Sequence, residues 1–262
     1  MRKETRGGRL ALPLLAACLL AGCATSYNVA TERQESLFIT TEREVQMGKA
    51  VSKRVEEELP VVRDPALLER LDRVGQRIAA VADRKDIVYQ FAIVEEKEPN
   101  AFALPGGIVY VTSGLMELVK SDDELASVLG HEVGHLTARH VVKRIQGALG
   151  LELLQILAVG AGSTDSRTRQ GMDLAFASLL TAYSQNDELE ADRLGARYMK
   201  RAGFQPGAAI TFLTRLRDHT LKEPLREFSY FRTHPYFSDR LRVVRQESEG
   251  KISFDDYINT QR

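Results

Sequence analysis

Two histidines and a glutamate stand together in a pattern that can bind and use a metal ion. Residues 131–135 read His-Glu-Val-Gly-His. On a helix, this spacing places His131 and His135 on one face about one turn apart, as two ligands of one tetrahedral zinc ion require. Glu132 is offset by about 100° and can instead take a proton from the attacking water. The chain has only five histidines, so we interpret the pattern as a zinc site rather than as chance.

An acidic segment further along the chain offers the third ligand that such a site needs. Residues 187–192 read Asp-Glu-Leu-Glu-Ala-Asp, and Val141 excludes the variant motif in which a third histidine completes the site. Glu188 and Asp192 are four residues apart and share a helix face, whereas Glu190 lies about 200° from Glu188. We therefore predict Glu188 as the third ligand and Asp192 as the acceptor that fixes the tautomer of a metal-bound histidine. A solvated acidic helix face is the alternative.

The motif lies on a predicted helix that follows a small sheet. Ser121 and Glu124 fit a capping box, which starts a helix from about Asp122 to Gln146. Before this helix, residues 86–94 and 108–112 have the pattern of extended strands, with a Pro-Gly-Gly turn between them. These elements predict an α+β fold that is mainly helical, with a small β-sheet beside the motif helix.

Further helices are predicted on both sides of this unit. Apolar spacing indicates helices from Thr41 to Leu59 and from Pro65 to Ala82. The acidic segment belongs to a helix that Asn186 or Asp187 can cap and that runs to about Arg201. We expect a mixture of helix and loop beyond it.

Residues 147–183 read as a helical hairpin or lid. Two apolar segments, 148–161 and 174–182, flank a polar stretch. Each segment is shorter than the roughly 20 residues that a bilayer span requires. We interpret the hairpin as part of the core or as a lid, and a hairpin that dips into a membrane is the alternative.

Residues 1–22 have the layout of a lipoprotein signal peptide. Four basic residues precede an apolar run at residues 10–20 that is too short to span a bilayer. Leu-Ala-Gly-Cys, ending at Cys23, resembles a bacterial lipobox, so we predict that Cys23 carries the lipid. Residues 23–40 then read as a lipid-anchored polar tether, and residues 41–262 as the domain. An ordinary signal peptide with a chance cysteine is the alternative.

Composition excludes several other classes of protein. Lys+Arg and Asp+Glu are equal at 36 each, so no basic surface points to nucleic acid. Cys18 lies inside the signal peptide, which leaves the mature chain without a disulfide and restricts metal ligands to nitrogen and oxygen. Ala24 follows the lipidated cysteine, which favours the outer membrane, facing the periplasm, over the inner membrane.

Four segments together resemble the HtpX/BepA/Oma-type family of envelope metallopeptidases. They read HEVGH, ELEADRLGA, NAFALPGGIVYVTSGL and THPYFSDR, and the likeness runs from about Glu42 to Arg245. The resemblance implies a zincin-type domain with the ligands His131, His135 and Glu188, supported by Asp192. These are the residues that the spacing also selects.

The resemblance also implies roles that spacing alone does not give. His234 and Arg240 would lie near the metal and stabilise the tetrahedral oxyanion, or His234 would occupy the fourth zinc position as a self-inhibiting plug. Residues 100–112 would form a cleft-edge strand that holds an extended substrate, and a plain hairpin is the alternative. The short 147–183 segment replaces the membrane helices of HtpX-like members, and no helical repeats of the BepA type follow. The chain is therefore most similar to the stand-alone, LoiP-like lipoprotein branch.

These features predict a zinc-dependent endopeptidase with one zinc ion per chain. Its substrates would be unfolded, misfolded or misassembled periplasmic and outer-membrane proteins, and the outer-membrane assembly machinery would be a partner. The alternative is a zinc-stabilised chaperone or assembly factor with little or no proteolysis. An iron oxygenase with two histidines and one carboxylate would use the same ligands, but the general-base glutamate disfavours it.

Overall fold

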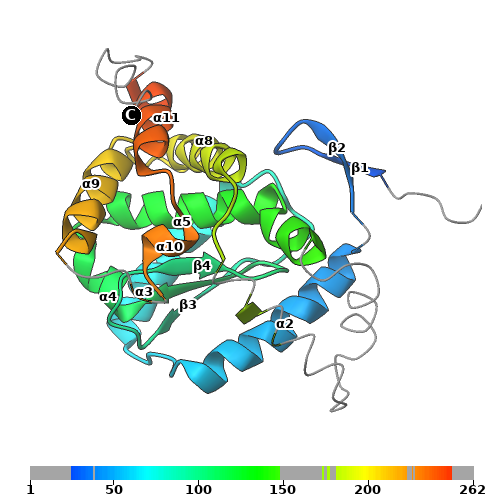
Figure 1. Cartoon of the computed structure of the whole chain (residues 1–262), viewed down its shortest axis with the longest axis horizontal. Coiled ribbons are helices and arrows are strands. Elements are labelled where there is room, and N and C mark those ends of the chain that lie inside the picture. Colours follow the sequence, from blue (N-terminus) through cyan, green and yellow to red (C-terminus); the bar gives the residue numbers. More distant parts are fainter. Residues whose placement is uncertain are drawn as a thin grey trace, which may run out of the picture.

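The computed structural model describes residues 25–37, 39–147, 173, 176, 177, 181–222, 226 and 228–249. Its central element is α5 (Asp122–Thr137), in which every residue from Glu124 to Thr137 is buried. Figure 1 shows α5 between the small sheet and α8 (Gln185–Arg201). The motif helix is thus covered on all faces. This arrangement confirms the predicted α+β fold, mainly helical with a small sheet beside the motif helix.

The sheet has three strands in the order β3-β5-β4. β3 (Gln90–Val94) pairs in parallel with β5 (Ile108–Thr112), and β4 (Ala101–Ala103) pairs antiparallel with β5. The expected strand at residues 100–112 is therefore a hairpin, with β4 at the sheet edge and in contact with α5. Gly106 and Gly107 form its turn with φ of 79° and 108°, conformations that side chains rarely adopt.

The two early helices form as predicted. α2 (Thr41–Glu58) begins after Thr40, whose side chain accepts a hydrogen bond from the amide of Arg43. α3 (Pro65–Val81) begins after Asp64, whose carboxylate caps the first turn, with Pro65 in the favoured first position. A short helix, α4 (Ser113–Leu118), follows β5.

The start of α5 is as predicted, but its predicted end is wrong. Ser121 caps the helix by accepting from the amide of Glu124 at 3.2 Å. The helix was expected to run to Gln146, whereas it stops at Thr137 and residues 140–147 form a separate helical segment. Arg139 causes the break because it adopts a left-handed φ of 57°. Its guanidinium holds this turn by donating to the carbonyl of Ile39 at 3.0 Å.

The second half of the domain is helical with short connections. α8 is capped by Ser184, whose hydroxyl accepts from the amide of Asp187. The predicted cap, Asn186 or Asp187, lies inside the helix. Gly203 closes the helix with a φ of 75°. The remaining helices are α9 (Ala208–Thr220), α10 (Tyr230–Thr233) and α11 (Phe237–Glu249). The predicted signal peptide and nearly all of the 147–183 hairpin lie outside the described residues.

The N-terminal part of the described chain is a β-hairpin packed on the domain. β1 (Thr25–Asn28) and β2 (Arg33–Ser36) pair antiparallel, within the stretch expected to be a polar tether. Asn28 donates to the carbonyl of Thr137 at 3.0 Å, and Lys143 donates to Glu35 at 2.6 Å. Residues 25–37 are therefore folded against the end of the motif helix. No helix in the described ranges combines the length and apolar character needed to cross a membrane.

Candidate active site

The site depends on an unusually close approach of α5 and α8. A Cβ atom added to Gly134 would lie 2.7 Å from the carbonyl oxygen of Ala191, and one added to Gly195 would lie 2.9 Å from the backbone of Gly130. Larger residues at these positions would force the two backbones apart. The glycines therefore bring the first turns of α8 directly over the motif histidines, and Glu188 arrives there from α8.

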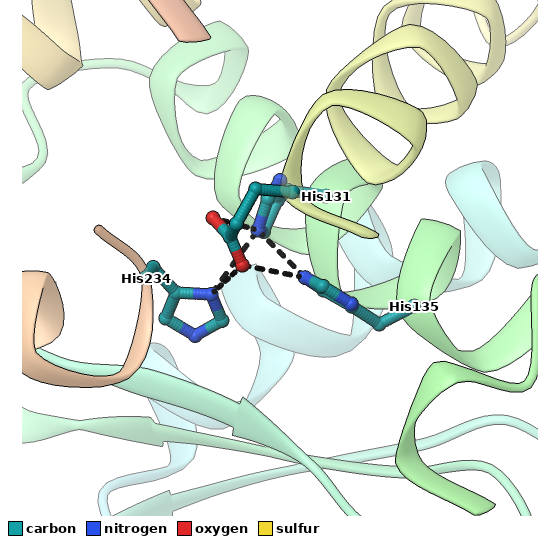
Figure 2. A group of neighbouring side chains, drawn as sticks. His131, His135 and His234 are labelled. Atoms are coloured by element: carbon teal, nitrogen blue, oxygen red, sulfur yellow. Dashed lines mark hydrogen bonds and ion pairs between the residues drawn. The ribbon is translucent and has the colours of Figure 1, made fainter. Parts of the chain in front are cut away.

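Four buried side chains converge on one point. The Nε2 atoms of His131 and His135 are 3.0 Å apart. Glu188 lies against both, with Oε1 at 3.2 Å from Nε2 of His135 and Oε2 at 3.6 Å from Nε2 of His131. One ligand atom from each of these residues and from His234 lies within 4.8 Å of the others. Figure 2 shows the three imidazole rings pointing toward one another.

His234 approaches from the opposite side of the cluster, just after α10. Its Nδ1 atom is 3.0 Å from Oε1 of Glu188 and 3.3 Å from Nε2 of His131. The ring stacks on Tyr230, with centroids 4.5 Å apart, and the side chain is fully buried. The structure thus brings His234 into the position of a fourth ligand rather than merely near the site.

Glu132 faces the same space without joining the cluster. Its side chain is fully buried, and neither carboxylate oxygen has a hydrogen-bond partner among the described residues. Oε1 lies 3.5 Å from Nε2 of His234. A buried carboxylate without a partner is costly, so this position is suited to a group that must exchange a proton with a bound water.

Asp192 and Arg240 form a second layer behind the histidines. Asp192 Oδ1 lies 2.7 Å from Nδ1 of His131. Arg240 donates to both oxygens of Asp192 at 2.9 Å, and its Nη1 lies 3.1 Å from Oε2 of Glu188. The guanidinium is fully occupied by these carboxylates and by the hydroxyl of Tyr230. These contacts favour a positioning role for Arg240 over direct contact with a substrate.

The local charges keep each group in the form that a metal site needs. Burial holds the pKa of His135 well below its usual range, so the ring stays neutral. Burial alone would raise the pKa of Glu188, but electrostatic interactions with His234, Arg240 and His131 hold it well below its usual value. Burial alone would also raise the pKa of Asp192, but the charge of Arg240 beside it brings that pKa below its usual value. Both acids are therefore carboxylates at neutral pH.

The donor set fits a zinc ion. Imidazole nitrogens and a carboxylate oxygen are ordinary zinc ligands, and three protein ligands with one further position are typical of catalytic sites. His131, His135, Glu188 and His234 each present one such atom to the same buried point. His131, His135 and Glu188 would hold the ion, with His234 able to take the remaining position.

Sequence reasoning did not single out His140. Its Nδ1 atom lies 3.0 Å from Nδ1 of His135, and its Nε2 atom lies 3.1 Å from Oε2 of Glu190. In an unbroken helix, residues 135 and 140 would point about 140° apart. Only the turn at Arg139 brings the two rings together. The one available signal was the concentration of three of the chain's five histidines within ten residues.

Comparison with known proteins gives consistent matches. The model of peptidase family M48 matches residues 65–248. The beta-barrel assembly-enhancing protease of Escherichia coli K12 is 32% identical over 222 residues, which cover 79% of this chain and 44% of that protein. The mitochondrial metalloendopeptidase OMA1 of Schizosaccharomyces pombe is 34% identical over 176 residues, which cover 67% of this chain and 51% of that protein.

A third relative supports the branch suggested by the sequence. The metalloprotease LoiP of Escherichia coli K12 is 31% identical over 157 residues, which cover 59% of this chain and 61% of that protein. The chain spans about half the length of the first two relatives. These matches confirm the resemblance to the HtpX/BepA/Oma-type family and its LoiP-like branch.

Proposed function

Because this chain belongs to peptidase family M48, we propose that it is a zinc-dependent endopeptidase of the bacterial cell envelope, with one zinc ion per chain. The observation that carries the proposal is the position of Glu132. This carboxylate is buried without a hydrogen-bond partner among the described residues, beside a cluster of three imidazoles and Glu188. A purely structural metal site would leave no reason for such a group.

Each side chain then has a distinct task. A bound zinc ion supplies Lewis acidity, which polarises the scissile carbonyl and lowers the pKa of water towards about 7. Glu132 takes the proton of the attacking water and passes it to the leaving amine. Asp192 fixes the tautomer of His131, while Arg240 holds Asp192 and Glu188 in place. His234 occupies the fourth ligand position in the resting form and must move aside for a substrate.

We further propose an attachment and a substrate class. Cys23 carries a lipid that holds the chain at the outer membrane, facing the periplasm, and the substrates are unfolded or misassembled envelope proteins. One of the relatives, named as a beta-barrel assembly-enhancing protease, supports an envelope role. Its name also supports a connection with the outer-membrane assembly machinery.

The proposal predicts that Glu132→Gln keeps the metal and loses cleavage. The full-length chain, purified in detergent, is assayed for zinc by elemental analysis and for digestion of an unfolded protein such as casein. General-base catalysis contributes about 10²- to 10⁴-fold, so cleavage should fall by at least about 100-fold while the zinc content stays at one per chain. Glu57→Gln, which changes an exposed glutamate of α2, is the matched control.

Three results would bear on the alternatives. Full cleavage by Glu132→Gln contradicts the assigned chemistry. If the unaltered chain binds zinc but does not cut, while His234→Ala cuts, then His234 is the plug. If neither of these two proteins cuts and both bind unfolded clients, the chaperone interpretation replaces the peptidase.

A further inference from the structure

His135 is supported differently from the other motif histidine. His131 contacts a carboxylate directly, because Nδ1 lies 2.7 Å from Oδ1 of Asp192. The corresponding atom of His135 instead meets another imidazole, at 3.0 Å from Nδ1 of His140. A nitrogen-to-nitrogen contact of this length contains one hydrogen atom. Which of the two rings carries it decides whether His135 can bind a metal.

The partners of the Nε2 atom of His140 determine which ring carries the hydrogen. Its Nε2 atom lies 3.1 Å from Oε2 of Glu190 and 3.4 Å from Oδ1 of Asp187. An ionised glutamate can only accept hydrogen bonds. Nε2 of His140 must carry a hydrogen to donate to it.

This donation fixes the direction of the hydrogen bond between His140 and His135. A neutral imidazole with a hydrogen on Nε2 has a free lone pair on Nδ1. Neutral His140 therefore accepts at Nδ1, and His135 is the donor there whenever its Nε2 atom binds a metal. With its single hydrogen on Nδ1, neutral His135 leaves Nε2 free to bind a metal. The opposite arrangement would place the hydrogen on Nε2, the atom that faces Glu188.

The surroundings hold both rings in this geometry. His135 stacks on Tyr183 with centroids 3.9 Å apart and an angle of 22° between the rings. His140 is 2% exposed, and the left-handed turn at Arg139 directs it back toward the end of α5. Glu190 belongs to α8, the same helix that supplies Glu188. The contacts from His135 through His140 to Glu190 thus connect the two helices that build the site.

We propose that His140 and Glu190 are positioning residues that hold His135 in the tautomer that binds the metal. Glu190, which helix geometry excludes as a ligand alongside Asp192, acts through His140 on the second motif histidine. The site then has two supports of different kinds, a carboxylate behind His131 and an imidazole with its carboxylate behind His135. This inference rests on the proposed zinc site.

The test compares zinc affinities by chelator competition on the full-length chain in detergent. His140→Phe keeps the volume of the ring but removes the acceptor for His135, and His140→Asn returns an oxygen close to the position of Nδ1. Loss of such a supporting hydrogen bond weakens metal binding by about 10- to 100-fold. We expect this loss for His140→Phe and substantial recovery for His140→Asn. His219→Phe is the matched control, since His219 lies on α9, away from the site.

A spectroscopic measurement on the unaltered chain tests the same point without relying on a variant that folds. Only five histidines need assignment. In zinc-loaded protein labelled with nitrogen-15 at histidine, we expect hydrogens on Nδ1 of His135 and on Nε2 of His140. A hydrogen on Nδ1 of His140 with none on Nδ1 of His135 would overturn the inference.

The outcomes separate this inference from the proposed function. If the unaltered chain and His140→Phe bind zinc equally tightly, the zinc site stands and the positioning role is wrong. If His140→Asn binds as weakly as a folded His140→Phe, the hydrogen-bond acceptor is not what matters, and the role is also wrong. If the unaltered chain binds no zinc, the proposed function fails, and the inference fails with it.

Discussion

Asp192 connects a candidate ligand to a buried cation, and this makes it the most informative single residue to change. It accepts from Nδ1 of His131 at 2.7 Å and from two nitrogens of Arg240 at 2.9 Å. In Asp192→Asn, one of the two acceptor oxygens is lost, together with the charge that balances the guanidinium. We expect zinc affinity to fall by about 10- to 100-fold, measured by competition with a chelator.

The control for this prediction is Asp218→Asn. Asp218 is exposed on α9, where it forms an ion pair with the neighbouring Arg217. Its replacement should leave zinc affinity unchanged. Equal affinities for Asp192→Asn and Asp218→Asn would show that the contact with His131 has no influence on the metal.

The site residues differ in how far sequence could predict them. His131, Glu132 and His135 follow from local helix geometry, and Glu188 follows from the face that it shares with Asp192. His234 and Arg240 come from the distant C-terminal region, so only a family resemblance could place them. His140 was missed because its position depends on a break in the helix and not on helical spacing.

At the scale of elements, the contact between α5 and α8 decides whether the site can assemble. We expect Gly195→Ala to destabilise the fold by about 1–3 kcal/mol, although alanine favours helix formation over glycine by about 1 kcal/mol. The added Cβ would lie 2.9 Å from backbone atoms of Gly130 and His131. The helices must then separate, so zinc affinity should fall as well. Denaturant unfolding and chelator competition measure the two effects.

Gly207→Ala is the control for Gly195→Ala. Gly207 precedes α9, and an added Cβ would meet nothing within 4 Å. Its replacement should change stability little and zinc affinity not at all. A Gly195→Ala protein as stable as Gly207→Ala would contradict the view that close backbone contact limits this interface.

Helix starts were easier to predict than helix ends. Asp64 and Ser121 cap α3 and α5 through their own side chains, so the signal is local. The end of α5 depends on Arg139, whose left-handed turn is held by the carbonyl of Ile39 and the carboxylate of Glu44. Both partners are about 100 residues away, and no local pattern contains that information.

For the whole molecule, Glu44 is a buried residue that joins α2 to several other elements. Its carboxylate accepts two hydrogen bonds from Arg84 at 2.8 Å and one from Arg139 at 2.9 Å. It also accepts from the amide of Gly106 in the β4-β5 turn at 3.2 Å. Glu44 thus ties α2 to the sheet and to the end of the motif helix.

We expect Glu44→Ala to destabilise the protein by about 3–5 kcal/mol, because it leaves two largely buried arginines without their shared partner. Thermal unfolding of the zinc-free chain measures this directly. Glu57→Ala removes an exposed partner of Arg54 on the same helix, and surface pairs contribute about 0–1 kcal/mol. If the two variants had the same Tm, the buried cluster would not be a major source of stability.

The fold class was predictable because the hydrophobic patterns of the helices and of strands β3 and β5 are strong. The internal position of α5 was not, since it depends on distant parts of the chain. The structure covers this helix with α8 and α9, which come more than 45 residues later in the chain. Burial of a whole helix is set by what packs on it, and this appears only when the complete domain is assembled.

The folded hairpin β1–β2 sets how far this domain can reach. As an extended tether, residues 23–40 could stretch to about 60 Å at 3.3–3.6 Å per residue. The hairpin is packed on the body and begins at Thr25, so two residues at most about 7 Å long separate it from the lipid that we propose on Cys23. Most of the stretch that was expected to be a tether is thus folded onto the domain. Under the proposed attachment, the active site would therefore stay within a thin layer next to the bilayer surface.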